Sequence, residues 1–140
     1  MRIVSGMTSI ETGRAETRTI TLTAKPDRVF DYLSDARHLP EWAPGFAPAV
    51  EHEHGDVWRI PDETGPRRVA VKVAKDHGVV DFVSADAPNL GLFARVVPNL
   101  TGAELIFSLF FPAGTDPAAV DAQMTVVDQE LKTVRERVEA

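Results

Sequence analysis

The fold is decided by residues 20–42, which read ITLTAKPDRVFDYLSDARHLPEW. Apolar residues and threonines alternate over Glu16–Ala24, and this period of two predicts a half-buried strand. Pro26 and Asp27 then change the pattern, because proline is tolerated in the first turn of a helix and an acidic side chain suits its positive end. We therefore expect a helix of about two turns, whose apolar face is formed by Val29, Phe30 and Leu33.

A second short helix is expected directly after the first. Ser34 and Asp35 are good N-cap residues for it, and Leu39 and Trp42 lie three residues apart, as neighbours on one helical face do. The prolines and glycine of residues 44–48 then end this helix.

The middle of the chain consists of short apolar segments separated by turn residues. These segments are residues 50–54, 57–60, 69–73, 79–85, 90–97 and 104–111. Short turns between strands are typical of an antiparallel meander, since parallel strands need long crossover connections. Together with the first strand, we expect a sheet of about seven antiparallel strands.

Residues 116–138 are typical of one long amphipathic helix. Asp116 can cap it, and Pro117 suits its first position. Apolar residues then recur at steps of four and three, at Val120, Met124, Val127, Leu131, Val134 and Val138. A coiled-coil seam has the same spacing, but we favour packing within the chain, because the sheet needs a cover for its apolar face. The sequence thus predicts an α+β fold.

Composition and charge exclude several classes of protein. With 140 residues, of which 44% are hydrophobic and 26% charged, the chain fits a single globular domain, which we place at residues 15–140 after a flexible leader at residues 1–14. The lack of cysteine excludes a disulfide scaffold and thiol chemistry. A net charge of −6 argues against nucleic acid as a partner, and no apolar run is long enough for a membrane span. We expect a cytoplasmic protein, because the leader has no secretory apolar core.

Two pieces of the opening stretch carry a resemblance to a known family. They are Pro-x-x-Val-Phe at residues 26–30 and Asp-x-x-x-Leu-Pro-x-Trp at residues 35–42. Residues 15–46 resemble the opening of the polyketide cyclase/dehydrase branch of the START-like (SRPBCC) superfamily, and the order of elements over residues 15–140 agrees with its helix-grip fold. The resemblance implies a curved sheet that wraps the last helix and encloses a cavity. Members of the superfamily share that cavity more than they share a catalytic motif.

Strand and helix parity then predict which side chains line the cavity. The ligand-binding candidates are Trp42, Phe46, Leu92, Phe107, Leu109, Phe111, Met124 and Val127. Val69, Val71 and Val73 are expected on the same concave face of the sheet. We expect Trp42 at the entrance, since an indole suits the boundary between an apolar cavity and water. The alternative is a solid core made by all these residues, with Trp42 as a plug beneath the short helices.

The polar residues offer weaker candidates, and we assign no catalytic residue. His52 and His54 would share one face of a strand, a spacing that metal sites use, but no further ligand is marked, so we expect no metal and no other cofactor. We expect both histidines at a solvated strand edge, and the alternative is that one reaches the cavity as a general base. Tyr32 is a candidate for a hydroxyl group at the rim.

These patterns lead to three hypotheses of function. We favour a protein that holds a small hydrophobic or aromatic molecule, lipid- or polyketide-like, between the sheet and the last helix, as a monomer or homodimer. The first alternative is a cyclase- or aromatase-type enzyme that acts in the same cavity, aided by His52, His54 or Tyr32. The second alternative is a protein-interaction module.

Overall fold

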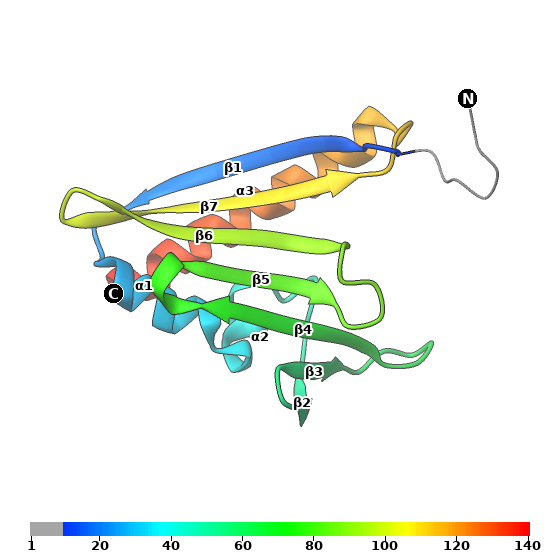
Figure 1. Ribbon diagram of the computed structural model, residues 1–140, viewed down its shortest axis with the longest axis horizontal. Coiled ribbons are helices and arrows are strands. Elements are labelled where there is room, and N and C mark those ends of the chain that lie inside the picture. The colour runs from blue at the N-terminus through cyan, green and yellow to red at the C-terminus, as the bar shows by residue number, and fades with distance from the viewer. Residues whose placement is uncertain (1–9) are drawn as a thin grey trace.

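The computed structural model describes residues 10–140 and places three helices on one face of an antiparallel sheet (Figure 1). The strands are β1 (Arg14–Leu22), β2 (Glu51–His54), β3 (Val57–Ile60), β4 (Arg67–Ala74), β5 (Val79–Ser84), β6 (Gly91–Asn99) and β7 (Gly102–Phe111). The helices are α1 (Pro26–Ser34), α2 (Leu39–Trp42) and α3 (Pro117–Glu139), with 3-10 turns η1 (Ala36–His38) and η2 (Lys75–His77). This is the helix-grip fold, and it confirms the predicted order of elements.

The seven strands form one sheet in the order β1-β7-β6-β5-β4-β3-β2, with every neighbouring pair antiparallel. Strands β2 to β7 are the predicted meander, in which each strand turns back beside the one before it. The segment containing α1 and α2 runs from β1 to the opposite edge of the sheet, where the meander starts with β2 (Figure 1). The last strand of the meander, β7, then pairs with β1.

Two turns fix the register of the meander. Gly78 has a φ of +65°, and a Cβ atom there would lie 2.0 Å from the Val96 carbonyl oxygen, so the β4–β5 connection requires glycine. At the other turn, β6 extends to Asn99 and β7 starts at Gly102. The connection between these strands is therefore only two residues long, with Leu100 at a φ of 53°.

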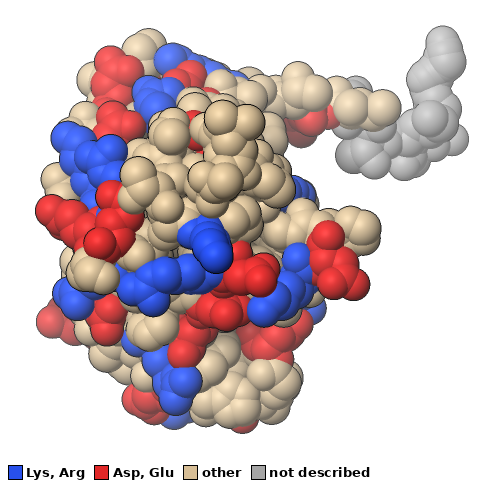
Figure 2. All heavy atoms as spheres, turned by 90° about the vertical axis from the view of Figure 1, so that its left-hand side faces the viewer, with Lys and Arg blue, Asp and Glu red and all other residues tan. Residues whose placement is uncertain are grey.

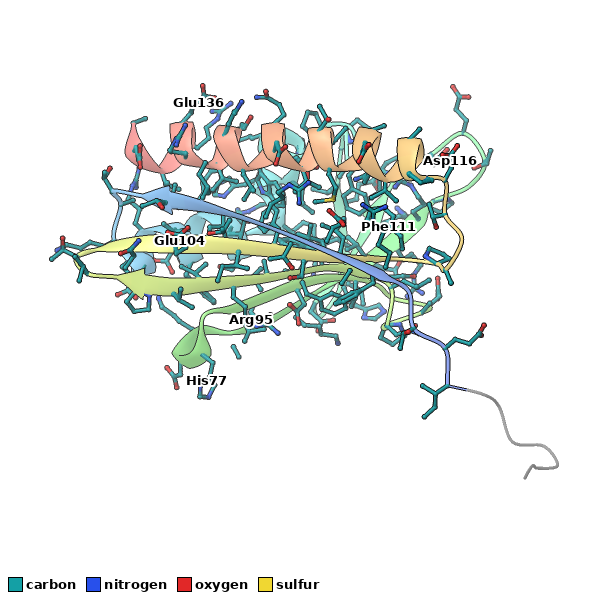
Figure 3. All side chains as sticks on the ribbon, turned by 90° about the horizontal axis from the view of Figure 1, so that it is seen from above. His77, Arg95, Glu104, Phe111, Asp116 and Glu136 are labelled. Atoms are coloured by element: carbon teal, nitrogen blue, oxygen red, sulfur yellow. The ribbon has the colours of Figure 1, made fainter. Side chains whose placement is uncertain are left out.

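The long helix α3 covers the concave face of the sheet. The Asp116 side chain caps it by accepting a hydrogen bond of 3.0 Å from the Ala118 N–H. All six positions of its apolar stripe are buried against the same chain, which confirms intramolecular packing over a coiled-coil seam. Figure 3 shows Glu136 on the solvent side of α3, and Arg95 and His77 beyond the opposite face of the sheet.

Polar pairs cover the convex face of the sheet. Arg95 donates to Asp81 over 2.7 Å, and the hydroxyl groups of Thr17 and Ser108 lie 2.9 Å apart across β1 and β7. This convex face also carries a small apolar cluster that the sequence did not lead us to expect. Its buried members are Val57, Ala70 and Val83.

One residue predicted on the concave face lies outside the core. Val69 and Val71 are buried as expected, but Val73 is 53% exposed. The reason is the length of β3, which pairs with β4 only over residues 67–70. Beyond that point β4 is an edge strand, and Val73 has a neighbouring strand, β5, on one side only.

The first nine residues of the expected leader lie outside the described residues, and β1 begins at Arg14. No helix within residues 10–140 is both long enough and apolar enough to cross a membrane. Figure 2 shows acidic and basic side chains interleaved at the end of the molecule that holds the β6–β7 turn. That face of the protein therefore presents no continuous basic patch of the kind that phosphate backbones need.

Candidate ligand-binding cavity

A cavity of about 770 Å³ lies between the concave face of the sheet, the α2 segment and α3. Its apolar wall is formed mainly by Leu39, Trp42, Ala43, Phe46, Ile60, Val69, Phe82, Leu92, Leu109 and Phe111. Helix α3 contributes Ala119, Gln123 and Glu130, which lie beside the apolar stripe rather than within it. At these positions α3 thus presents a small or polar side chain to the space.

Three loops surround the mouth of the cavity. They contribute Pro66 from the β3–β4 loop, Asp86 and Leu90 from the β5–β6 loop, and Thr115 from the β7–α3 loop. All three loops lie at the right-hand end of the molecule in Figure 1. Leu90 and Phe46 are large apolar residues that remain exposed here. An exposed apolar rim of this kind is typical of a site that receives an apolar molecule.

The charged residues at the mouth are paired with one another. Arg67 donates to the Phe46 carbonyl oxygen over 2.6 Å, and its guanidinium lies 5.2 Å from the centre of the Phe46 ring. Arg68 bridges Glu53 and Asp86 at 2.7 and 3.0 Å. These contacts link the segments around the mouth, and they engage both guanidinium groups at the rim.

Five of the eight ligand-binding candidates from the sequence lie on the cavity wall, namely Trp42, Phe46, Leu92, Leu109 and Phe111. The other three, Phe107, Met124 and Val127, are buried in the core and do not line the cavity. Along β7 the division falls between Phe107 and Leu109, although the two residues point to the same face.

Trp42 forms part of the floor and does not lie at the entrance as expected. It is only 2% exposed, and its ring packs at 5.4 Å from Phe82 and 5.6 Å from Phe107, centre to centre. Its Nε1 atom is fully buried and has no hydrogen-bond partner among the described residues. Packing on two core aromatic rings favours the alternative expectation, in which Trp42 is a plug beneath the short helices. At the entrance the exposed aromatic residue is Phe46.

Glu130 is the ionisable group that the structure adds to the site. It is only 9% exposed, and its neighbours on the same helical face, Val127 and Val134, are fully buried. Burial raises the pKa of its carboxyl to about 7, with no charged or hydrogen-bonding partner contributing. A carboxyl in this state can bind a proton, donate a hydrogen bond or pair with a cation near neutral pH.

Glu130 was not among the residues predicted from the sequence, because the candidates there were the apolar stripes, the two histidines and Tyr32. The signal was its position, three residues after Val127 and four before Val134, which places a carboxylate at the edge of a buried helical stripe. Ala119 and Gln123 flank the stripe on the same side. A helical wheel that marks the small and polar residues bordering the stripe would have identified all three.

The polar candidates named from the sequence lie away from the cavity. His52 and His54 are exposed, and a β-bulge between them interrupts the simple alternation expected of this strand. His52 contacts the Gly55 carbonyl at 2.9 Å and His54 lies 3.3 Å from Glu53. Within residues 10–140 no three His, Asp or Glu side chains gather as metal ligands would.

Tyr32 also lies off the main cavity. Its hydroxyl donates to the Glu41 carboxylate over 2.8 Å. Burial, together with this carboxylate, raises the pKa of the Tyr32 hydroxyl above its ordinary range. The phenol is thus held in its neutral form and is engaged by a neighbour on α2.

Several solved structures have the same fold. The chain superimposes on norcoclaurine synthase from Thalictrum flavum with a TM-score of 0.62 at 14% identity, covering 94% of this chain and 98% of that one. The Aha1 dimer from Colwellia psychrerythraea matches with a TM-score of 0.68 at 12% identity, covering 90% of this chain and 96% of that one. XoxI from Bacillus cereus matches with a TM-score of 0.69 at 17% identity, covering 89% of this chain and 94% of that one. At these identities the similarity establishes the fold alone.

The family is established by the sequence as a whole. None of the curated proteins matches the chain significantly. A family model described as polyketide cyclase / dehydrase and lipid transport matches residues 15–139. This range includes all three helices and all seven strands, apart from the first residue of β1. The chain therefore belongs to the polyketide cyclase/dehydrase and lipid transport family of SRPBCC proteins.

Proposed function

We propose that this protein binds a small hydrophobic or aromatic molecule in the cavity between the sheet and α3. The observation that carries the proposal is the cavity itself, about 770 Å³ in volume with a wall that is largely aliphatic and aromatic. Sites for small organic molecules are generally of this size and make-up, with a few polar groups that fix orientation.

Packing density argues against an empty space as the working state. Protein interiors are packed as densely as organic crystals, and voids larger than a water molecule are few. Leu92, Leu109 and Phe111 are each only partly buried although they face the concave side. An apolar molecule in the cavity would complete their burial, with a gain of roughly 25 cal/mol for each Å² removed from water.

A cyclase-type activity is the second candidate, and Glu130 is the observation that favours it. Such an enzyme needs a group that transfers protons to or from the bound molecule. His52, His54 and Tyr32 do not line the cavity, whereas Glu130 does. Binding comes first because either function requires it.

Calorimetric titration with 2-(1-naphthyl)ethanol, a neutral aromatic probe, tests the proposal. We expect saturable binding of one molecule with micromolar affinity, about −8 kcal/mol. Ala119→Trp should abolish it, because the new indole would fill the cavity from α3. Ala122→Trp is the matched control, since Ala122 is exposed on the same helix and does not line the cavity.

The two tryptophan variants separate site binding from nonspecific binding. Equal titration curves for Ala119→Trp and Ala122→Trp would place the probe elsewhere on the protein and contradict the proposal. So would the absence of saturable binding by the unmodified chain.

A further inference from the structure

Glu130 is the one ionisable side chain on the cavity wall that has no partner among the described residues. Glu130 is nine-tenths buried, lies on the cavity wall and forms no hydrogen bond or ion pair with any described residue. Buried carboxyl groups are almost always paired or hydrogen-bonded, because an isolated buried charge is costly. The folded chain supplies no partner for this carboxyl group on the wall of an apolar cavity. The partner is therefore expected to come from a bound molecule.

Two cations on elements that pack against α3 are already engaged. On β1, Arg18 lies 3.4 Å from Asp128 and 3.3 Å from Glu16. From α1, Arg28 donates to the Val138 carbonyl over 2.6 Å.

Several other charged groups around α3 and the cavity are paired as well, whereas Lys132 and Arg135 are exposed on α3, form no ion pair among the described residues and do not contribute to the pKa of Glu130. Arg137, on α3 itself, lies 3.8 Å from Glu41 of α2. At the mouth, Arg67 lies 3.3 Å from Asp62, and Arg68 is held between Glu53 and Asp86. None of these groups supplies positive charge to Glu130, so the interior of the cavity has one unbalanced acidic group.

We propose that the ligand of this cavity carries a basic nitrogen, which is held as an ammonium group against the Glu130 carboxylate. The inference rests on the proposed function and names the class of molecule, an amine with an apolar or aromatic body. Such a ligand supplies the missing cation, and its apolar part covers the open wall formed by Leu92, Leu109 and Phe111. A ligand carboxylate would instead meet a like charge in a poorly solvated space.

Three probes that differ only in their polar group test the inference by calorimetry. They are 2-(1-naphthyl)ethylamine, 2-(1-naphthyl)ethanol and 1-naphthylacetic acid, which at about pH 8 are a cation, a neutral alcohol and an anion. We expect the amine to bind at least about tenfold more tightly than the alcohol, and the acid at least about tenfold more weakly.

The pH dependence provides a second readout that requires no variant. The amine must bind ionised Glu130, whose pKa burial raises to about 7 in the unliganded protein. Its dissociation constant should therefore rise about tenfold for each pH unit below about 7. Binding of the alcohol should change little over the same range, because the alcohol carries no charge.

Two substitutions on α3 separate Glu130 from general charge effects. Glu130→Gln should bring the amine and the alcohol to within about threefold of each other and remove the pH dependence of amine binding. Glu136→Gln is the matched control, because Glu136 is exposed on the solvent side of the same helix (Figure 3), and it should leave all affinities unchanged.

The outcomes distinguish this inference from the proposed function. If the unmodified chain binds the alcohol as tightly as the amine, or if Glu130→Gln retains the preference for the amine, the inference is overturned while the cavity remains a binding site. If none of the three probes binds, the proposed function fails, and the inference fails with it.

Discussion

The two ends of the layer between the sheet and α3 differ although they are built from the same kinds of residue. At the closed end, Leu105 and Phe107 of β7 are completely buried. At the open end, Leu109 and Phe111 continue the same face of the same strand but line a cavity. We call these regions the closed half and the open half of the layer.

The difference arises from what faces β7 across the layer. The second half of α3 presents Leu131, Val134 and Val138, which are buried against the chain. The first half also buries Val120, Met124 and Val127, but beside them it presents Ala119 and Gln123 to the cavity, and Glu130 lies near the middle of the helix. An alternating strand pattern therefore reports which side faces inward, whereas the size and polarity of the opposing residues decide whether that side is core or cavity wall.

The largest effect should come from removing a ring in the closed half. Phe107→Ala leaves a hole among fully buried side chains and should lower the free energy of unfolding by about 3–5 kcal/mol. Phe111→Ala is the matched change in the open half, and it should lower this free energy by only about 1–2 kcal/mol, because the ring already borders a space. Urea denaturation measures both values, and equal losses would contradict the division into two halves.

The next effect concerns Glu130 and depends on pH. Its pKa in the folded chain, about 7, lies above the ordinary 4.5, so the folded state holds the proton more tightly than the unfolded state does. Its contribution to stability is therefore fully present below about pH 4.5 and is lost as the pH rises to about 7. Glu130→Gln removes this loss and should be more stable than the unmodified chain by about 1–3 kcal/mol at about pH 8.

Thermal melts of both proteins over this pH range provide the measurement. The difference should shrink toward zero near pH 4.5, where Glu130 is protonated in the folded state and is half protonated in the unfolded state. A constant difference at every pH would mean that the carboxyl titrates normally and is not desolvated by the cavity wall.

The smallest effect is expected on the convex face, where both partners of an ion pair reach water. Arg95 lies 2.7 Å from Asp81, with side-chain exposures of 42% and 17%. A double-mutant cycle with Asp81→Asn and Arg95→Gln should give a coupling of at most about 1 kcal/mol. A coupling several times larger would show that the convex face contributes to the fold as strongly as the concave layer.

The sequence was sufficient for the elements and for their order. Alternation identified the strands, Pro26 and Pro117 marked two helix starts, and the stripe on residues 120–138 located the burying face of α3. These features follow from local periodicity and capping, which single segments carry by themselves. The family resemblance added the curvature of the sheet and the cavity.

The candidate site could be predicted only in part, for a physical reason. Phe107 and Phe111 have the same parity, the same side chain and the same expected face, yet only Phe111 borders the cavity. Whether a residue lines a space depends on the residue across the layer, and that pairing is not local in sequence. Val73 was misplaced for a similar reason, because its exposure depends on where β3 ends. Glu130 was missed because a charged residue beside an apolar stripe is usually solvated.

The central claim is that a small apolar molecule occupies the open half and leaves the closed half untouched. Methyl-group NMR tests it most directly, with the probe 2-(1-naphthyl)ethanol and assigned leucine methyl signals. We predict intermolecular nuclear Overhauser effects from the naphthyl ring to Leu92 and Leu109. We predict none to Leu105 or to Leu22, which is buried at the closed end, where β1 pairs with the start of β7. Contacts to the closed-half methyl groups, or no contact to either set at saturating probe, would contradict the claim.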